Sequence, residues 1–465
     1  MSVIWDSTTL NKIAQAKSNM VWEATGLQID SRKIKKGDLF CAIKGKRFDG
    51  HDYVDNAIKK GAAACLVSKK VSDLNNAAFS EVNDVLYALE KMAQEARKKS
   101  KAKFIAITGS VGKTGTKEIF RTCFSKLKNI YVNESSFNNH IGVPVSLSRI
   151  PASTKFCMLE IGMNRLGEIK NLSNLVKPEV AIITAIEKSH LEGLKTLKNI
   201  ALAKSEIIES LSSKGCLIYN EDTNFSKLLL EKAKKYNIEN IISYGTKSSA
   251  NIQLIDCKTI NNSYAIKVKY FGKVISWNMP LIGEHWIKNS LSIIALAVYF
   301  KLDIKSLVKE LNLFKVPSGR GNLLKLKLKN NRNKFFLIND SYNSNPASLS
   351  ASIENLSNIN NKGKKILVLG DMLELGKASV SLHIELKNKI ENNNVNLLFT
   401  HGKYMKYLNN ISLNISKKFH IENLDRLSSI LIKHIEDEDV VLIKGSNSMN
   451  LNEIVKKILV ESEPQ

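Results

Sequence analysis

Cysteine is scarce in this sequence, and its few copies are scattered. The 465 residues contain six cysteines, none of them forming a close pair. This spacing excludes a disulfide framework and a zinc module, because both need clustered cysteines. We therefore expect small buried thiols in a protein of the reducing cytoplasm.

Long apolar runs are also missing. The best candidate, residues 291–300, is far shorter than the roughly 18 residues that a spanning helix needs. The first six residues include no basic segment leading into an apolar one, so nothing there marks the chain for export. We expect no stable insertion into a membrane.

The overall composition is that of an ordinary globular chain. It is 43% hydrophobic and 24% charged, which excludes a disordered protein, a collagen-like fibre and a coiled-coil rod. At about 150 residues per domain, the length predicts three domains with sizeable cores.

Positive charge is in excess, since 69 Lys and Arg against 44 Asp and Glu give a formal net charge of +25. The lysines are spread along the whole chain, without interleaved stacking aromatics of the kind that bind RNA or DNA. We interpret the charge as a solvated surface that attracts an anionic substrate. A basic nucleic-acid-dependent ATPase remains the alternative from another class.

The pattern of apolar runs predicts an α/β protein with three domains: a small N-terminal α/β domain (1–84), a central parallel-sheet phosphate-loop ATPase domain (85–314) and a C-terminal Rossmann-like α/β domain (315–465). A Pro- and Gly-containing linker at 316–320 separates the last two. A period-two stretch from 251 to 279 predicts a small antiparallel appendage. The expected strands are 39–43, 62–67, 104–108, 156–161, 180–186, 335–339, 365–370, 396–401 and 440–444, and the expected helices include 53–60, 85–100 and 286–300.

The strongest local motif spans residues 104–116, where an apolar strand runs into a glycine-containing loop and a helix. Glycines let backbone N–H groups converge on phosphate oxygens, and the helix start adds partial positive charge. Lys113 is placed to bridge the outer phosphates, and Thr114 supplies a hydroxyl for Mg²⁺. Gly109 lies only three residues before Gly112, so the spacing departs from the usual eight-residue pattern. The strand–loop–helix setting still predicts ATP or GTP binding.

Glu160 lies near the end of the predicted strand 156–161 and His190 follows the predicted strand 180–186, and ligands of such sheets collect at the carboxyl ends of strands. A carboxylate inside an apolar strand is costly unless something satisfies it. A metal ion, a substrate amine and a salt bridge to a lysine all remain open for Glu160. A lone loop histidine is more often solvated than a ligand, but the expected proximity of His190 to Glu160 and Thr114 keeps a metal role open.

The motifs taken in order resemble the Mur ligase family, collinearly from about residue 30 to residue 453. Residues 340–346, Asp-Ser-Tyr-Asn-Ser-Asn-Pro, are the most discriminating, because sister ligases differ there. The other matching segments are 30–32, 37–40, 49–52, 108–116, 138–144, 160–162, 167–169, 189–192, 203–206, 319–320, 369–376 and 444–446.

The resemblance implies an ATP-dependent amide ligase that joins D-alanyl-D-alanine to UDP-N-acetylmuramoyl-tripeptide through an acyl phosphate. Such a ligase acts in peptidoglycan synthesis, and so in cell wall biogenesis, cell shape and cell division, in the cytoplasm. The implied cofactors are ATP and Mg²⁺, and we expect a monomer. Because the site is split between domains, it must close to work, which predicts hinges near residues 84 and 316.

The resemblance also implies roles for individual residues. Lys204 matches a lysine that the family carbamylates, although by spacing alone it is one lysine among many. For the asparagines, capping of their own backbone is the default alternative. The implied catalytic residues are Lys113, Glu160, His190 and Lys204; the metal ligands Thr114, Glu160, His190 and Lys204; the ATP contacts Gly109, Ser110, Val111, Gly112, Lys113, Thr114, Gly115, Asn289, Arg320 and Asp340; the UDP-sugar peptide contacts Ser31, Arg32, Asn138 and Asn139; and the dipeptide contacts Asn343 and Asn345.

Two positions depart from the family pattern. This chain reads His285-Trp286 where His-Asn is common, and Asn339 stands where an acidic residue is frequent. The rival interpretations within the enzymes are a sister ligase that adds the third amino acid and a folyl-polyglutamate-type ligase. A catalytically silent binding protein is disfavoured because Lys113, Thr114 and Lys204 are all present.

Overall fold

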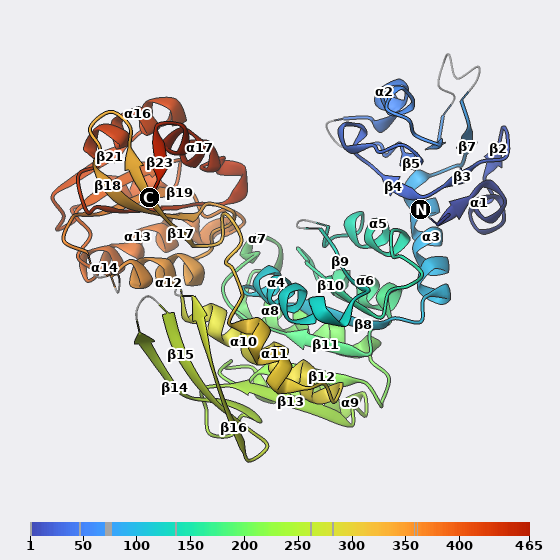
Figure 1. The fold of residues 1–465 in the computed structure, drawn as a ribbon, viewed down its shortest axis with the longest axis horizontal. Helices are drawn as coiled ribbons and strands as arrows, with labels where there is room; N and C mark the ends of the chain where they lie inside the picture. The colour runs from blue at the N-terminus through green and yellow to red at the C-terminus, as the bar shows by residue number, and fades with distance from the viewer. Residues whose placement is uncertain are drawn as a thin grey trace.

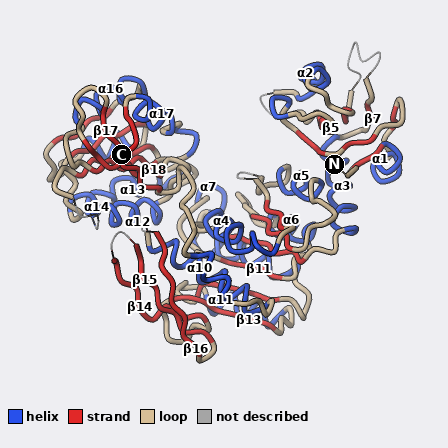
Figure 2. The backbone as a smooth tube through the Cα atoms, viewed as in Figure 1, coloured by secondary structure: helices blue, strands red, loops and turns tan. Residues whose placement is uncertain are grey.

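Three lobes follow one another along the chain in the computed structural model, which describes residues 2–45, 48–69, 77–134, 137–260, 263–280, 283–357, 359 and 361–465. Figure 1 shows the N-terminal lobe in blue, the central lobe from cyan to yellow and the C-terminal lobe in orange and red. Each lobe has its own sheet flanked by helices (Figure 2). The predicted α/β architecture is confirmed. No helix among the described residues is long and apolar enough to cross a membrane.

The N-terminal lobe is built on a five-stranded sheet in the order β2-β7-β6-β5-β4, with a separate β1–β3 pair. Strands β5 and β6 are buried along their whole length, because each reads as a continuous run of four residues that pack on both faces. The elements are β1 (Trp5–Asp6), α1 (Ser7–Ala14), β2 (Lys17–Ser18), β3 (Glu23–Ala24), β4 (Gly26–Gln28), η1 (Ser31–Lys33), β5 (Asp38–Cys41), η2 (Gly50–Tyr53), α2 (Val54–Lys59), β6 (Ala64–Val67) and β7 (Phe79–Glu81).

The central lobe contains a nine-stranded sheet in the order β16-β15-β14-β13-β12-β11-β8-β10-β9. Strand β8 lies between β11 and β10, both parallel to it, so its carboxyl end opens at the middle of the sheet. The elements are α3 (Val85–Lys99), β8 (Lys103–Thr108), α4 (Lys113–Phe124), η3 (Ser125–Leu127), β9 (Ile130–Val132), α5 (Gly142–Ser148), β10 (Phe156–Glu160), α6 (Glu168–Val176), β11 (Val180–Ile183), α7 (Leu191–Leu194), α8 (Leu197–Ser205), η4 (Glu206–Ser210), β12 (Cys216–Asn220), α9 (Ser226–Lys235) and β13 (Asn240–Gly245).

The predicted antiparallel segment is present, but it is not a separate appendage. Strands β14 (Ile252–Ile260), β15 (Ser263–Tyr270) and β16 (Lys273–Pro280) form an antiparallel meander, and β14 pairs in parallel with β13. The meander therefore continues the central sheet. It is followed by α10 (Glu284–Tyr299), which lies on α4 and on strands β12, β13 and β14 of the sheet, and by α11 (Ile304–Leu311).

The C-terminal lobe has a seven-stranded sheet in the order β21-β20-β19-β22-β18-β17-β23. The predicted strands 335–339, 365–370, 396–401 and 440–444 correspond to its parallel strands β18, β19, β20 and β22, and the strand β17, which was not predicted, is antiparallel to both β18 and β23. The elements are β17 (Asn322–Leu328), β18 (Lys334–Asp340), α12 (Pro346–Ser357), β19 (Lys365–Gly370), η5 (Gly376–Ala378), α13 (Ser379–Ile384), α14 (Leu386–Glu391), β20 (Leu397–His401), α15 (Met405–Asn410), β21 (Lys417–His420), α16 (Leu424–His434), β22 (Val440–Lys444), η6 (Asn447–Met449), α17 (Asn452–Val460) and β23 (Ser462–Pro464).

The N-terminal and central lobes share part of one apolar core. Helix α3 packs on α1 and on α5, and Val145 of α5 lies in the same buried cluster as Leu89 of α3. The indole N–H of Trp5 donates to the carbonyl of Ser148 across 2.8 Å. Arg149 adds a bond of 2.7 Å to the carbonyl of Leu27. These contacts seat the N-terminal lobe on α5.

The C-terminal lobe contacts the central lobe at α7. The loop after β19 leads into η5, which packs on α7. The N–H of Glu192 donates to the carbonyl of Glu374 at 3.1 Å. This contact brings the carboxyl edge of the C-terminal sheet toward the glycine loop of the central lobe (Figure 1).

Candidate functional site

The glycine loop connects β8 to α4 in the geometry that the sequence predicts. Gly112 has a φ of 95°, a left-handed value, and a Cβ there would come within 2.6 Å of Asn289 Oδ1. Glycine is therefore required at this position. Lys113 begins α4, and its Nζ donates to the carbonyl of Gly109 at 2.6 Å, so its amine lies over the loop. Burial lowers the pKa of Lys113.

Glu160 ends β10 directly beside the loop and is 4% exposed. Its Oε2 accepts a hydrogen bond from Thr114 Oγ1 at 2.8 Å, and its Oε1 accepts one from Asn138 Nδ2 at 2.9 Å. Burial alone would raise the pKa of this carboxyl. The charges of Lys113 and Lys117, with the two hydrogen bonds, outweigh burial and hold the pKa below its usual range. The site therefore contains a buried carboxylate next to a threonine hydroxyl.

Lys117 is a site residue that the sequence reasoning missed. It lies one helical turn after Lys113, its side chain is fully buried, and its Nζ is 3.6 Å from Glu160 Oε2. The same amine donates to the carbonyl of Asn133 at 2.8 Å. The signal was available, because Lys113 and Lys117 are four residues apart and so share one face of the helix. The salt bridge to a lysine, one of the readings left open for Glu160, is present.

Lys204 lies on α8 with 2% of its surface exposed. Among the described residues its amine has no hydrogen bond or ion pair. Burial, and secondarily the charge of Lys113, lower the pKa of Lys204 well below its usual value. Burial of this kind disfavours the charged form of the amine, an effect that a surface lysine would not have.

His190 is directed to the C-terminal lobe. Its Nδ1 lies 2.6 Å from Glu374 Oε2, on the loop after β19. The contact with His190, ahead of any other cause, holds the pKa of the Glu374 carboxyl below its usual range. Within the described part of the chain, no three His, Cys, Asp or Glu side chains are grouped so as to hold a metal ion. Of the four predicted metal ligands, the structure joins Thr114 and Glu160 by a direct bond.

Helix α10 closes the other side of the loop. Asn289 is 5% exposed, its Nδ2 has no hydrogen-bond partner in the part of the chain that the structure describes, and a Cβ on Gly115 would come within 2.5 Å of that atom. A buried, unpaired amide aimed at a phosphate loop is a ready ligand contact. Trp286 packs beside it, 3.1 Å from the same Cβ position and 5.1 Å from the Phe314 ring, centroid to centroid. The departure from the family pattern is thus a buried core residue.

The C-terminal lobe contributes an arginine and a buried ion pair. The guanidinium of Arg320 lies 3.7 Å above the ring of Tyr342. Asp340 ends β18, and its Oδ2 accepts from Lys444 Nζ at 2.7 Å. The charges of Arg320, Asp340 and Lys444 all act on His285 at the start of α10, although burial is the main cause that lowers the pKa of His285 to about 4.

The predicted substrate asparagines are largely engaged with backbone. Asn139 Oδ1 accepts from the N–H of Gly142 at 2.9 Å, at the start of α5. Asn345 Oδ1 accepts from the N–H of Ser348 at 2.9 Å, at the start of α12, and Asn343 Oδ1 from that of Ser344 at 2.9 Å. Asn139, Asn343 and Asn345 therefore bond to backbone N–H groups, as the capping alternative predicts. Asn138 differs, because it contacts Glu160.

In the N-terminal lobe, Ser31 and Arg32 form the start of η1. Ser31 is 6% exposed, whereas the Arg32 side chain is 85% exposed and pairs with Asp30 at 2.8 Å. In Figure 1 the blue N-terminal lobe, to which η1 belongs, lies apart from α4, at whose start the glycine loop ends. The structure therefore does not bring Ser31 and Arg32 together with the loop.

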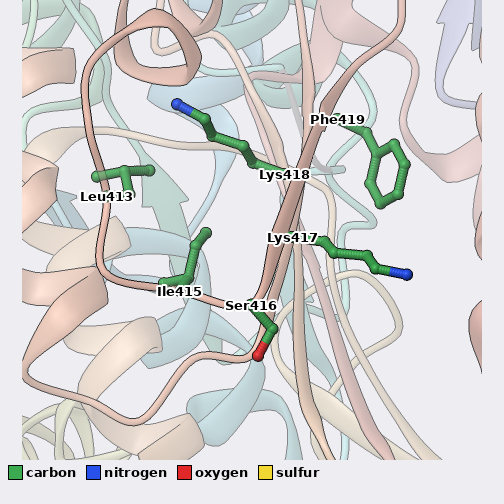
Figure 3. A pocket seen from close by; sticks show the side chains of 6 residues that line it. All are labelled: Leu413, Ile415, Ser416, Lys417, Lys418 and Phe419. Atoms are coloured by element: carbon green, nitrogen blue, oxygen red, sulfur yellow. The ribbon is translucent and has the colours of Figure 1, made fainter.

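A hollow of about 320 Å³ lies elsewhere, at the edge strand β21 of the C-terminal sheet. Figure 3 shows Lys417 and Phe419 projecting to one side of the strand and Lys418 to the other. None of the predicted site residues lines it. We assign the site to the glycine loop instead, since charged and unpaired groups converge there.

These features define a class: a phosphate-loop protein whose glycine loop is flanked by two further α/β lobes, one of which brings charged groups to it. Family comparisons agree with that class. The Mur ligase family catalytic domain matches residues 23–99, the Mur ligase middle domain residues 107–297, and the Mur ligase glutamate ligase domain residues 326–447. The chain belongs to the Mur ligase family.

Relatives of known name extend over nearly the whole chain. It is 36% identical to the UDP-N-acetylmuramoyl-tripeptide–D-alanyl-D-alanine ligase of Rickettsia prowazekii, over 97% of this chain and 99% of that one. It is 33% identical to the ligase of the same name from Bacillus subtilis, over 93% of each chain.

Solved structures give the same result for the fold. The structure of MurF from Acinetobacter baumannii superposes with a TM-score of 0.84 at 26% identity, over 98% of both chains. A folylpolyglutamate synthase from Mycobacterium tuberculosis has a TM-score of 0.64 at 15% identity over 82% of this chain, and shares the fold alone.

Proposed function

We propose that this chain is an ATP-dependent ligase that joins D-alanyl-D-alanine to UDP-N-acetylmuramoyl-tripeptide, giving the UDP-muramoyl-pentapeptide precursor of peptidoglycan. The observation that carries the proposal is the match to ligases of that name over 97% of this chain and 99% of a relative at 36% identity. A ligase adding the third amino acid and a folyl-polyglutamate-type ligase are less well supported, because their solved structures have TM-scores of 0.51 and 0.64.

ATP binding rests on the glycine loop. The loop N–H groups at the start of α4 and the Lys113 amine suit the phosphates, and the Asn289 amide adds a donor, its Nδ2, at Gly115. Arg320 and Asp340 would contact the nucleotide from the C-terminal lobe. The full proposed set is Gly109, Ser110, Val111, Gly112, Lys113, Thr114, Gly115, Asn289, Arg320 and Asp340.

The donors at Glu160 suit Mg²⁺. The Thr114 hydroxyl and the Glu160 carboxylate are oxygen ligands 2.8 Å apart, and Mg²⁺ prefers oxygen and completes its shell with phosphates and water. When bound, the ion supplies charge neutralisation on the phosphates. His190 and Lys204 are the further proposed ligands. Lys117, also on α4, pairs with the same oxygen, Glu160 Oε2, at 3.6 Å.

Carbamylation of Lys204 is part of the proposal. CO₂ reacts with a neutral amine, and burial without a partner lowers the pKa of Lys204 as this reaction needs. The carbamate would convert a cation into an anion able to bind the metal. We expect Lys204→Ala to be folded and nearly inactive, with partial rescue by a short carboxylic acid. Wild-type turnover in this variant would contradict the carbamate.

The substrates would be held between lobes. Ser31, Arg32, Asn138 and Asn139 are proposed for the UDP-sugar peptide, and Asn343 and Asn345 for the dipeptide. Several of these side chains bond to backbone N–H groups at the starts of helices or turns. Substrate binding therefore requires either contacts from the backbone N–H groups of these residues or a closing movement of the lobes. We propose the domain limits 1–84, 85–314 and 315–465, a monomer, and a cytoplasmic location.

The reaction follows from these positions. The terminal carboxylate of the tripeptide attacks the γ-phosphate, and Lys113 stabilises the charge on the phosphate oxygens as ADP leaves. The amine of the dipeptide then attacks the acyl phosphate and expels phosphate. When one closed site holds both substrates, their reacting groups are already adjacent and oriented, so the reaction does not depend on a second diffusional encounter.

An ADP-release assay tests the function. We expect ADP only when UDP-N-acetylmuramoyl-tripeptide, D-alanyl-D-alanine and Mg²⁺ are all present, with the pentapeptide seen by mass. A panel of single amino acids and of other UDP-muramoyl peptides serves as the control. Equal turnover with a single amino acid as acceptor would contradict the dipeptide assignment.

A further inference from the structure

Glu374 is a residue that the proposed function leaves without a role. It sits in the loop after β19, within the segment 369–376 that the sequence motifs include, and its φ of 63° is left-handed. For a residue other than glycine this backbone costs on the order of 1 kcal/mol, and such strain persists where the surrounding structure imposes it.

The loop is firmly held on both sides of Glu374. Asp371 accepts hydrogen bonds from the N–H groups of Tyr404 and Met405, at 3.0 and 2.7 Å, and the N–H of Met372 donates to His383 Nε2 at 2.9 Å. Leu375 is buried. The carboxylate is therefore carried on a rigid support, as a binding group needs.

The carboxylate faces the phosphate end of the loop in the central lobe. Its Oε2 is 2.6 Å from His190 Nδ1, and its charge acts on Lys113, the proposed phosphate-bridging residue. Its side chain is 53% exposed. Among the described residues, Oε1 has no hydrogen bond, so one oxygen is free for a ligand.

The other carboxylate whose charge acts on Lys113 is unsuitable for a substrate. Glu160 is 4% exposed and is bonded to Thr114 and Asn138. An ammonium group arriving from solvent could not reach it. Glu374 is therefore the accessible anion beside the place where the acyl phosphate would form.

The sheet places Glu374 near the proposed dipeptide residues. Strands β18, β22 and β19 are adjacent and parallel, so the loops that follow β18 and β19 leave the same edge of the sheet. Asn343 is in the first of these loops, and its carbonyl accepts from Lys444 Nζ at 3.0 Å. Both loops thus leave the edge of the C-terminal sheet that is directed toward the central lobe.

We propose that the Glu374 carboxylate binds the ammonium group of the incoming D-alanyl-D-alanine, and so positions that amine beside the tripeptide carbonyl. The inference rests on the proposed function and names one of its substrate contacts. A hydrogen bond between two charged groups is about twice as strong as a neutral one, which suits a small ligand that must be held at one end.

Glu374→Gln tests the charge and keeps the shape. Glutamine can still accept from His190, so the contact between the lobes is retained while the anion is lost. In initial-rate assays we expect the KM for D-alanyl-D-alanine to rise about tenfold or more, which is the effect of losing one charged contact. The KM values for ATP and for the UDP-tripeptide should stay within twofold of wild type.

Two controls separate this role from others. Glu385→Gln removes the same charge from an exposed position between α13 and α14 of the same lobe, and should leave every constant unchanged. Borohydride trapping of the acyl phosphate, without the dipeptide, should give equal yields for Glu374→Gln and wild type. Thermal unfolding checks that the variant is folded.

Three results would overturn the inference. An unchanged acceptor KM would exclude the ammonium contact. A raised Mg²⁺ requirement with an unchanged acceptor KM would make Glu374 a metal ligand, and a parallel rise in all three KM values would make it only a closing contact. If wild type itself gave no product with the dipeptide, the proposed function would fail first, and the inference with it.

Discussion

At the scale of single residues, Lys113 is the site residue whose substitution should lower activity most. We expect Lys113→Ala to lower kcat by on the order of 10²–10³-fold, the usual cost of removing one preorganised charge stabiliser. Steady-state ADP release measures this, with Lys101→Ala, an exposed lysine before β8, as the matched control. Near-wild-type turnover would mean that the loop is not the catalytic nucleotide site.

Lys204 makes a prediction about stability and pH. Its pKa in the folded protein is well below its value in the unfolded chain, so the unfolded state binds more protons between those two values. Stability must therefore rise with pH through that window. In CO₂-free buffer at pH 7, we expect Lys204→Met to be more stable than wild type by more than the ~0.5 kcal/mol typical of surface changes.

Urea unfolding from pH 7 to pH 10 provides the measurement. The difference between Lys204→Met and wild type should shrink as the pH rises toward the unfolded-state lysine pKa of about 10.4, because removing the proton from the wild-type lysine on folding then costs less free energy. A difference that does not depend on pH would contradict a depressed pKa.

Residue identity alone predicted some of these roles and not others. Lys113 and Thr114 could be assigned, because a strand, a glycine loop and a helix fix their positions locally. The contact of Asn138 with Glu160 could not, because Asn138 reaches the carboxylate from a separate segment of the chain, whereas Lys117 could have been found from its spacing to Lys113. Glu374 could not be recognised either, since its contact with His190 depends on how two lobes meet.

At the scale of elements, the junction of α4 and α10 gives a further prediction. In a helix alanine is preferred to glycine by about 1 kcal/mol. A Cβ on Gly115 would nevertheless come within 2.5 Å of Asn289 and 3.1 Å of Trp286. We therefore expect Gly115→Ala to destabilise the protein by about 1–3 kcal/mol, as overpacked sites do, and to raise the KM for ATP.

Gly272→Ala is the matched control for that variant. A Cβ at this turn meets nothing within 4 Å, although its φ of 80° still costs something. It lies between β15 and β16 and should leave the KM for ATP unchanged. If Gly115→Ala bound ATP normally, the tight fit of the two helices would not matter for the site.

The elements themselves were predicted where periodicity is strong. The buried parallel strands and the period-two stretch at 251–279 were placed within a few residues, since both patterns arise from local burial. Strand β17 was missed, although leucine and lysine alternate in it. Its partner strand β23 is separated from it along the chain by most of the residues of the lobe. A three-residue edge strand such as β23 has no signal of its own, because only its pairing partner makes it a strand.

At the scale of the whole molecule, the net charge of +25 separates two classes of function. If the charge serves an anionic small substrate, ADP release should be unchanged by added DNA or RNA at any salt concentration. A nucleic-acid-dependent ATPase would instead be stimulated, and the stimulation would fall steeply with salt. The ADP-release assay with and without duplex DNA, single-stranded DNA and RNA decides between them.

The lobes could be counted from the sequence, but their contacts could not be deduced from it. Length and the change of pattern near residues 84 and 316 indicated three units. The sequence could not show that α3 packs on two lobes, because the apolar face of a helix has the same sequence pattern whichever neighbour covers it. Only the packing of α3 on both α1 and α5 shows that the first boundary is not a free hinge.

The hydrogen bond from Trp5 to Ser148 has a consequence for how the protein is made. The two residues are 143 positions apart, so the Trp5 indole cannot form this bond until the ribosome has synthesised all the residues between them. At about 5–20 residues per second this takes on the order of ten seconds. The N-terminal lobe therefore cannot complete its core when its own last strand, β7, has been made: Val145 of α5 belongs to the same buried cluster, so the core stays incomplete until α5 has left the ribosome.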